Sequence, residues 1–420
     1  MEQLFDVIRT VAGQHQQEAI AIRRKIHQHP EMANMEVRTS AWVARHLRGI
    51  GVDEVYEGLA GGTGVIGILH GAHDGPTVGL RGDMDAQAVR EQSGLPFSSQ
   101  DTCQWGEETL PVTHCCGHDV HTAMLMTTAT VLAQLRNLIR GKVMFVFQPA
   151  EEGPSPGWKG LHGAQAMVQE PIFQKNKPEA MLALHVDPKQ PIGTAGELSF
   201  AAGQTCMAIS AFSIELTGIG GHNATPWQGV DTLLPAAQIL QALQHVVTRN
   251  VNPNNNRVVL TVGQLSGGTK YNIIADRAVI RGACRFSDYQ TRAFLEGRIQ
   301  DIVTGTALAG NVQGKLIWDM HYPPNFNSQQ LMDQMAPRLE RTLGVGKIIN
   351  QGVRCQHVPD DFSYYTLEIP SIYALLSCSP DTGDLATVPG LHSPDMIVNE
   401  RCIPKGIEAL VTFALTYSLT

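Results

Sequence analysis

The feature that most constrains the fold of this chain is a repeated alternation of short apolar runs with helix-like segments. Four runs have the length and composition of buried strands, and they are TVGLR (77–81), VMFVFQPA (143–150), MLAL (181–184) and SIYALLS (371–377). Strands that alternate with helices along a chain form a largely parallel sheet covered by helices on both faces. The sequence therefore predicts an α/β fold.

Three helices of this first region are delimited by local signals. Residues 6–29 are predicted as one helix that stops at Pro30, because the residue before a proline disfavours helical backbone. A second helix is predicted to begin with Ser40 as its N-cap and to end at Gly51. A third is predicted over residues 122–141, with Gly141 as its stop.

The pattern changes near Cys206, which predicts a second domain. From there the order strand–helix–strand–strand–helix indicates a compact α+β unit of about 100 residues. Buried-strand character returns after it, and 420 residues exceed one ordinary hydrophobic core. We expect a large discontinuous α/β domain over residues 1–205 and 310–420, interrupted by a smaller inserted domain over 206–309.

Composition excludes several classes of partner. The net charge is −8 and no basic tract is present, which argues against nucleic acid, since binding phosphates requires clustered Lys and Arg. No apolar run approaches the roughly 18 residues of a membrane span, and the first residues do not have the pattern of a secretory signal. Most of the eight cysteines lie in apolar surroundings, as free thiols do. We therefore expect a cytoplasmic protein.

Polar, metal-competent residues follow the predicted strands. Asp83 and Asp85 follow the first strand, Glu151 and Glu152 the second, and His185 ends the third, while His392 comes after the fourth. An acidic pair is more often a solvated loop, and a lone histidine is more often a hydrogen-bonded core residue. In an open α/β sheet, however, the carboxyl ends of the strands converge on one edge, where ligands bind. The coincidence of all these positions favours a functional site.

The stretch HCCGHDVH (114–121) adds Cys116 and His118, whose C-x-H spacing lets a thiolate and an imidazole reach one centre. With Glu152, His185 and His392 this gives five candidate ligands, which suits two ions about 3.5–4 Å apart better than one tetrahedral ion. The thiolate favours Zn²⁺, while the other ligands also suit Mn²⁺, Co²⁺ or Ni²⁺. A redox centre fits poorly, because adjacent cysteines rarely reach disulfide geometry.

Glu151 is left without a ligand role in this scheme. A carboxylate beside a metal site can act as the general base of a hydrolase, taking a proton from water and passing it to the leaving nitrogen. Sequence order alone leaves open that Glu151 and Glu152 exchange roles, or that one of them is merely exposed.

These motifs resemble the M20 family of metallopeptidases, in its amidohydrolase branch of aminoacylases, hippurate hydrolases and auxin-conjugate hydrolases. The resemblance runs through nearly the whole chain. It is carried by RRKIHQHPE (23–31), RGDMDA (81–86), HCCGHDVH (114–121), FQPAEEG (147–153), ALHVDP (183–188), GGHNATP (220–226), GGTKYNIIAD (267–276), DDFSYY (360–365) and LHSP (391–394).

The resemblance implies a zinc-peptidase-like catalytic domain with two divalent ions and assigns roles by motif position. Cys116, His118, Glu152, His185 and His392 would be the metal ligands, Glu151 the general base, and Asp85 the acid that supports the metal site. Asp83 stands where other M20 branches carry a ligating histidine. The C-x-H pair would supply the replacement ligand.

The resemblance also implies that the inserted domain is a lid and dimerisation domain. His222 in GGHNATP would approach the active site and stabilise the oxyanion, although a histidine beside two glycines is otherwise a turn residue. Asn272 would help to hold the substrate carboxylate. A homodimer would form through the strand SAFSIEL (210–216) or its neighbouring helix.

The sequence thus predicts a metal-dependent amidohydrolase that cleaves N-acyl or N-aroyl amino acids, with a metal-bound hydroxide as the attacking group. A dipeptidase or aminopeptidase of the same fold is the nearest alternative, and a non-catalytic metal-binding protein is a second. A complete ligand set together with Glu151 argues against the second. The acyl group, the amino acid, the native metal and the oligomeric state are not given by the sequence.

Overall fold

The computed structural model describes residues 2–189, 194–254, 257–344, 348–349, 359–381, 384 and 386–419. The chain divides into two compact units. The first comprises residues 1–205, 326–354 and 361–420, and the second comprises residues 206–325 and 355–360.

An eight-stranded sheet forms the centre of the first unit. Its strand order is β1 (Glu54–Leu59), β2 (Gly64–His70), β6 (Arg140–Gln148), β3 (His73–Asp83), β7 (Ala180–Asp187), β18 (Ser371–Ser377), β8 (Leu198–Ser199) and β17 (Ile348–Ile349). Strands β6, β3, β7 and β18 are parallel neighbours, whereas β1, β2 and β8 join antiparallel. The predicted α/β class with a largely parallel sheet is confirmed.

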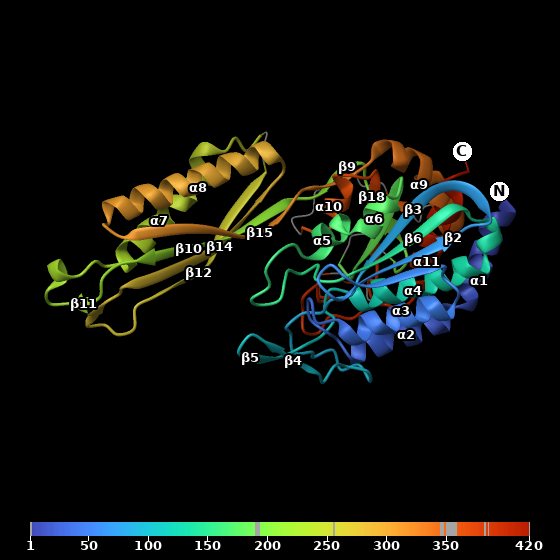
Figure 1. Ribbon diagram of the computed structural model, residues 1–420, viewed down its shortest axis with the longest axis horizontal. Helices are drawn as coiled ribbons and strands as arrows, with labels where there is room; N and C mark the ends of the chain where they lie inside the picture. The colour runs from blue at the N-terminus through green and yellow to red at the C-terminus, as the bar shows by residue number, and fades with distance from the viewer. Residues whose placement is uncertain are drawn as a thin grey trace. The chain divides into compact units, whose positions relative to one another are not determined.

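Helices cover both faces of this sheet (Figure 1). On β6, Val143, Phe145 and Phe147 belong to the main core together with residues of α4 and α11, whereas the equally buried Met144 and Val146 point the other way. This alternation is what a strand buried on both faces requires. The helices are α1 (Glu2–Gln14), α2 (Gln16–Gln28), α3 (Val37–Gly49), α4 (His118–Gln134), α5 (Gly163–Gln169), α6 (Pro171–Lys175), α9 (Gln329–Leu343), α10 (Ser363–Thr366) and α11 (Cys402–Thr416).

The helix boundaries differ from the predicted ones at three places. The first predicted helix is two helices, α1 and α2, separated at His15. Helix α3 begins at Val37 rather than after Ser40, and α4 ends at Gln134, so that Gly141 belongs to β6. The smaller elements are β4 (Thr102–Trp105), paired with β5 (Glu108–Pro111), a 3₁₀ turn at Arg136–Leu138, β9 (Gly203–Cys206) and β16 (Asn325–Asn327).

The second unit is a four-stranded antiparallel sheet with two helices (Figure 1). The sheet order is β12 (Val258–Gly267), β14 (Arg277–Phe286), β10 (Ala208–Thr217) and β15 (Gln313–Tyr322), and α7 (Leu233–His245) and α8 (Tyr289–Ala309) share one core with it. The insert was expected to end at residue 309. In the structure this part of the second unit extends to Asn325, because β15 pairs along its length with β10. A small pair, β11 (Gly221–His222) and β13 (Ile273–Ile274), a 3₁₀ turn at Pro226–Gln228 and a π-helical turn at Val246–Asn250 complete the unit.

Two further observations concern the described residues only. Their helices include none that has both the length and the apolar composition to cross a bilayer. The cysteines among them are all free thiols, and all except Cys103 are buried.

Candidate metal centre

The loop before α4 brings Cys116 and His118 to one place through Gly117. Gly117 has φ 88°, and a Cβ atom there would lie 2.2 Å from Cγ2 of Val186 on the neighbouring strand β7. Only glycine tolerates both the left-handed backbone and this close approach. The loop is thereby pressed against the end of β7, and His118 becomes the first residue of α4.

A first group of candidate ligands lies at the carboxyl end of β7. The ligand atoms of Cys116, His118 and His185 lie within 4.8 Å of one another, and all three residues are buried. The Sγ atom of Cys116 is 3.6 Å from Nε2 of His185. The other ring nitrogen of His185, Nδ1, lies 2.8 Å from the carbonyl oxygen of Val186. A proton on Nδ1 for this hydrogen bond leaves the Nε2 lone pair facing the thiol.

A second group shares Cys116 with the first. It consists of Cys116, Glu152 and His392, whose ligand atoms again lie within 4.8 Å of one another. The Nε2 atom of His392 is 3.2 Å from Sγ of Cys116 and 2.8 Å from Oε1 of Glu152. His392 has φ 64°, a left-handed backbone uncommon for a residue with a side chain, and its N–H donates to the carbonyl of Cys115 at 2.6 Å. All five predicted ligands thus come together in the first unit.

Glu151 and Asp85 border the same groups. Glu151 is buried, its Oε2 lies 3.9 Å from Nε2 of His118, and its Oε1 accepts the backbone N–H of Asp361 at 3.4 Å. Asp85 has one oxygen 3.2 Å from Nδ1 of His118, while its other oxygen accepts the N–H of Glu152 at 3.0 Å. Asp85 therefore orients two candidate ligands, His118 by a contact to its ring and Glu152 by a hydrogen bond from its backbone N–H. Carboxylates commonly orient metal-binding histidines in this way.

The donor atoms fit a cation. Nε2 of His118 is buried and has no hydrogen-bond partner among the described residues, although Nδ1 is bound to Asp85. Burial lowers the pKa of His118, but the charges of Asp83 and Asp85 outweigh burial and raise it to about 10. Burial raises the pKa of Glu152, but His392 and His118 bring it down to about 2. The surroundings of His118 thus stabilise positive charge at its buried ring, and a metal ion that displaces the proton from Nε2 would supply such a charge there.

A second layer of polar residues supports the centre and includes His121, for which no role was predicted. Arg81 donates to Asp83 at 2.5 Å, and the other oxygen of Asp83 is 2.6 Å from Nδ1 of His121. Nε2 of His121 accepts the N–H of Val186 at 2.9 Å, next to His185. The spacing of His118 and His121, three residues apart at the start of a helix, is the sequence signal that places both on one face.

Arg23 and His27 form a further buried network beside the metal loop. Arg23 donates to Asp119 at 2.7 Å, and Nδ1 of His27 is 2.8 Å from the same Asp119 oxygen. Nε2 of His27 lies 3.0 Å from Glu91. Arg23 and His27 lie on α2, Asp119 on α4, and Glu91 in the loop after β3. Because these segments are far apart in the sequence, the network is recognised only in the folded structure.

His222 and Asn272, the remaining predicted site residues, belong to the second unit. His222 on β11 is paired with Ile273 on β13, and the N–H of Asn223 donates to the carbonyl of Asn272 at 3.2 Å. The side chain of His222 is exposed, and its Nδ1 accepts the N–H of Ala224 at 3.1 Å. The two residues are neighbours on one small hairpin, and their roles remain predictions.

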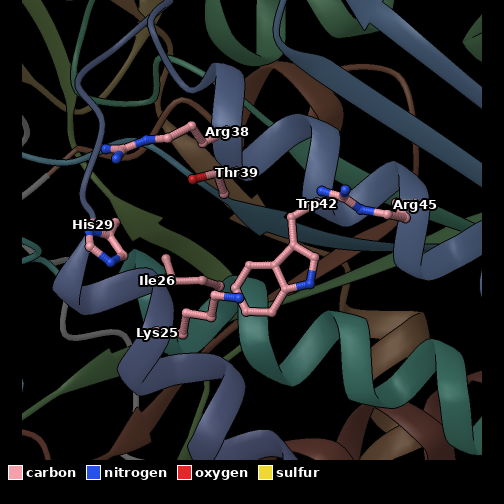
Figure 2. A pocket seen from close by; sticks show the side chains of 7 residues that line it. All are labelled: Lys25, Ile26, His29, Arg38, Thr39, Trp42 and Arg45. Carbon is pink, nitrogen blue, oxygen red and sulfur yellow. The ribbon is translucent and has the colours of Figure 1, made fainter.

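A cavity of about 380 Å³ between α2 and α3 is distinct from this centre (Figure 2). Figure 2 shows the ring of Trp42 beside Lys25, whose Nζ lies 4.7 Å from the ring centroid. The cavity contains none of the candidate site residues among those that line it. It is lined by Lys25, Ile26, His29, Arg38, Thr39, Trp42 and Arg45.

The chain is similar to known proteins along nearly its whole length. The profile of Peptidase family M20/M25/M40 matches residues 79–416. Hippurate hydrolase of Campylobacter jejuni is 31% identical over 396 residues, covering 94% of this chain and 95% of the relative. N-acetyl-L-cysteine deacetylase of Bacillus subtilis is 30% identical over 390 residues, covering 93% and 86%. A crystal structure from methicillin resistant Staphylococcus aureus, of a protein provisionally classed as an aminohydrolase, matches with a TM-score of 0.82 and 28% identity over 100% of both chains.

Proposed function

The chain belongs to peptidase family M20/M25/M40, in its amidohydrolase branch as the motifs predicted, and on that premise we propose that it hydrolyses the amide bond of N-acyl or N-aroyl amino acids. The observation that carries the proposal is the sharing of Cys116 between two donor groups, one of them fully buried, with Glu151 beside them. The relatives named above, an N-acetyl amino acid deacetylase and a hippurate hydrolase, support the substrate class.

Two divalent ions per subunit are the proposed cofactors, with Cys116, His118, Glu152, His185 and His392 as their ligands. The five donors, thiolate, carboxylate and three imidazoles, suit Zn²⁺ and also Mn²⁺, Co²⁺ or Ni²⁺. Such ions lower the pKa of water and polarise the amide carbonyl. The partnerless Nε2 of His118 supports this assignment, because a buried polar atom without a partner is costly unless something binds it.

The protein side chains would then carry the proton transfers. Glu151 takes the proton of the attacking water and delivers it to the leaving nitrogen. Asp85 keeps His118 in one orientation and fixes the backbone of Glu152. From the second unit, His222 would donate to the oxyanion and Asn272 would bind the substrate carboxylate.

We also propose a homodimer in the cytoplasm, formed through the inserted unit, but not through the expected strand SAFSIEL. That strand is part of β10, and both of its edges are already paired, with β14 and β15. The described sheet has two edge strands, β12 and β15, and of these β12 exposes the large apolar side chains of Val259 and Leu265. Light scattering on a size-exclusion column tests the dimer, and Val259→Lys or Leu265→Lys should convert it to a monomer.

The proposed activity is tested with a panel of N-acetyl, N-benzoyl and indole-acetyl amino acids beside plain dipeptides. After chelation, activity on the acylated substrates should vanish, and it should return on addition of Zn²⁺, Mn²⁺ or Co²⁺. Cleavage of dipeptides alone would favour the peptidase alternative. Two bound metals without turnover of any substrate would favour a non-catalytic metal-binding protein.

Metal affinity should rise with pH. Burial raises the pKa of the Cys116 thiol well above its usual range, with a further contribution from the charge of Glu152, and the pKa of His118 is raised to about 10. Both groups therefore hold a proton at neutral pH that a metal must displace, so affinity should fall as pH falls, by up to about tenfold per pH unit for each displaced proton.

Calorimetry in buffers of different ionisation enthalpy measures the number of protons released. Cys116→Ser should weaken binding and release fewer protons than the wild type. Cys115→Ser, at the adjacent buried thiol, is the matched control and should leave both quantities unchanged. Metal binding without proton release would contradict the proposed ligands.

A further inference from the structure

Glu36 is a fully buried carboxylate that the scheme above does not use. It precedes the first residue of α3, and both of its oxygens accept hydrogen bonds. Oε2 accepts from the hydroxyl of Thr63 at 2.7 Å, and Oε1 accepts from the backbone N–H of Ala150 at 2.9 Å. The second contact reaches the residue immediately before Glu151.

Ala150 has a backbone conformation that an alanine avoids. Its φ is 52°, in the left-handed region where the Cβ atom of an L-residue is crowded. The bend at Ala150 redirects the chain after β6 and so determines where the side chains of Glu151 and Glu152 point. An unfavourable conformation of this kind persists only where its surroundings hold it.

The turn is held at two points, one on each side of Glu151. Before it, the N–H of Ala150 donates to Glu36, and after it, the N–H of Glu152 donates to Asp85 at 3.0 Å. Both acceptors are buried carboxylates from other parts of the chain. The backbone of the general-base candidate Glu151 is therefore fixed on both sides, by the hydrogen bonds that the N–H groups of Ala150 and Glu152 donate.

We propose that Glu36 is a positioning residue: it holds Ala150 in the left-handed conformation and thereby aims Glu151 and Glu152 at the metal centre. The role of Glu151 in this statement rests on the proposed function. Among the described residues, the side-chain hydrogen bonds of Glu36 go to Thr63 and Ala150, so its effect would pass through the backbone of the turn.

The start of α3 leaves the Glu36 side chain available for this role. The first amides of the helix are satisfied by Glu31, which accepts the N–H of Arg38 at 3.0 Å and the N–H of Thr39 at 2.9 Å. Arg38 and Thr39 line the outer cavity of Figure 2, whereas Glu36 points into the protein. Glu31 thus caps α3, and the Glu36 side chain is left to accept the N–H of Ala150 in the turn after β6.

The chemistry of Glu36 makes glutamine its conservative replacement. Burial, with an added contribution from the charge of Asp85, raises the pKa of Glu36 to about 8, so a neutral side chain is well tolerated at this site. A glutamine is also neutral, has nearly the same shape, and keeps an oxygen for the N–H of Ala150. A methionine has a similar length but cannot accept that hydrogen bond effectively.

The test compares Glu36→Met, Glu36→Gln and the double variant Glu36→Met with Ala150→Gly. Glu36→Met should lower kcat about tenfold or more with KM changed by less than about threefold, because a misplaced general base affects the transition state and not substrate binding. Glu36→Gln should stay close to the wild type. Glycine adopts the left-handed conformation without strain, so Ala150→Gly should restore a large part of the kcat lost in Glu36→Met.

A second measurement does not depend on turnover. Zn²⁺ affinity and the visible absorption spectrum of the Co²⁺ form report the placement of Glu152, and both should change in Glu36→Met and recover in the double variant. Glu31→Gln is the control for a purely structural loss at the start of α3, and it should lower the melting temperature without changing kcat or the Co²⁺ spectrum.

Two results would overturn the role of Glu36. One is an unchanged Co²⁺ spectrum and kcat in Glu36→Met, and the other is a loss in Glu36→Met that Ala150→Gly does not relieve. If the wild type itself cleaves no acylated substrate, the proposed function fails. The metal affinity and the Co²⁺ spectrum then still decide whether Glu36 positions the turn.

Discussion

Replacing Glu151 by glutamine is expected to lower kcat by about a thousandfold or more while the metal content is retained. Glutamine keeps the size of the side chain and can still accept the N–H of Asp361, so the turn should not move. It cannot take a proton from water, because a neutral amide is not a base at neutral pH. Steady-state kinetics and metal analysis of the same protein samples measure the two quantities.

Glu152→Gln is the matched control, since it makes the same chemical change one residue later. It should weaken metal binding, and its activity should return in part at high metal concentration. The reverse result, with metal lost in Glu151→Gln and retained in Glu152→Gln, would show that the two glutamates exchange roles.

Arg23→Met is expected to lower the free energy of unfolding by about 3–5 kcal/mol, the range for breaking a buried ion pair. Arg23 is 2% exposed and its partner Asp119 is fully buried, so methionine would leave Asp119 a buried carboxylate with His27 as its remaining hydrogen-bonded side chain among the described residues. Burial raises the pKa of Asp119, but Arg23 and His27 outweigh it and hold that pKa well below its usual range. The contribution of the pair is therefore present at neutral pH and is lost as the pH falls toward the pKa of the folded state.

Denaturant titration of the metal-free protein measures this effect, and Arg24→Met is its control. Arg24 is 49% exposed and forms its ion pair with Glu400, so its loss should cost about 1 kcal/mol or less. Equal destabilisation by the two variants would contradict a special role for the buried pair. Because Asp119 follows His118, Arg23→Met should also weaken metal binding.

The grouping of the five candidate ligands could be predicted because their positions follow from the fold class. Glu152 and His185 come from the carboxyl ends of β6 and β7, which point to the same edge of a parallel sheet. The supporting residues could not be predicted in this way. Arg23 and Glu36 make their contacts with distant segments of the chain, and an isolated arginine or glutamate in a sequence carries no sign of its partner.

The helix boundaries failed where tertiary contacts outweigh local signals. Ser40 satisfies the local preference for an N-cap, but Glu31 accepts the backbone N–H groups of Arg38 and Thr39 from outside the helix, and α3 therefore starts earlier. Gly141 was predicted as a helix stop, yet its φ of 82° serves the start of β6, where a Cβ atom would lie 1.8 Å from the carbonyl oxygen of Pro76. Glycine marks a special backbone position, and only the surrounding structure determines which element it belongs to.

The inserted unit leaves and rejoins the chain at neighbouring points. Ile209, near the start of β10, is the cross-strand partner of Tyr322, near the end of β15, so the two ends of the insert are about 5 Å apart. A segment closed in this way can lengthen, shorten or be exchanged for another without stretching the polypeptide on either side. In evolution the metal centre and the inserted unit could therefore diversify at separate rates, and in the laboratory the same junction is suited to grafting a relative's insert onto this catalytic scaffold.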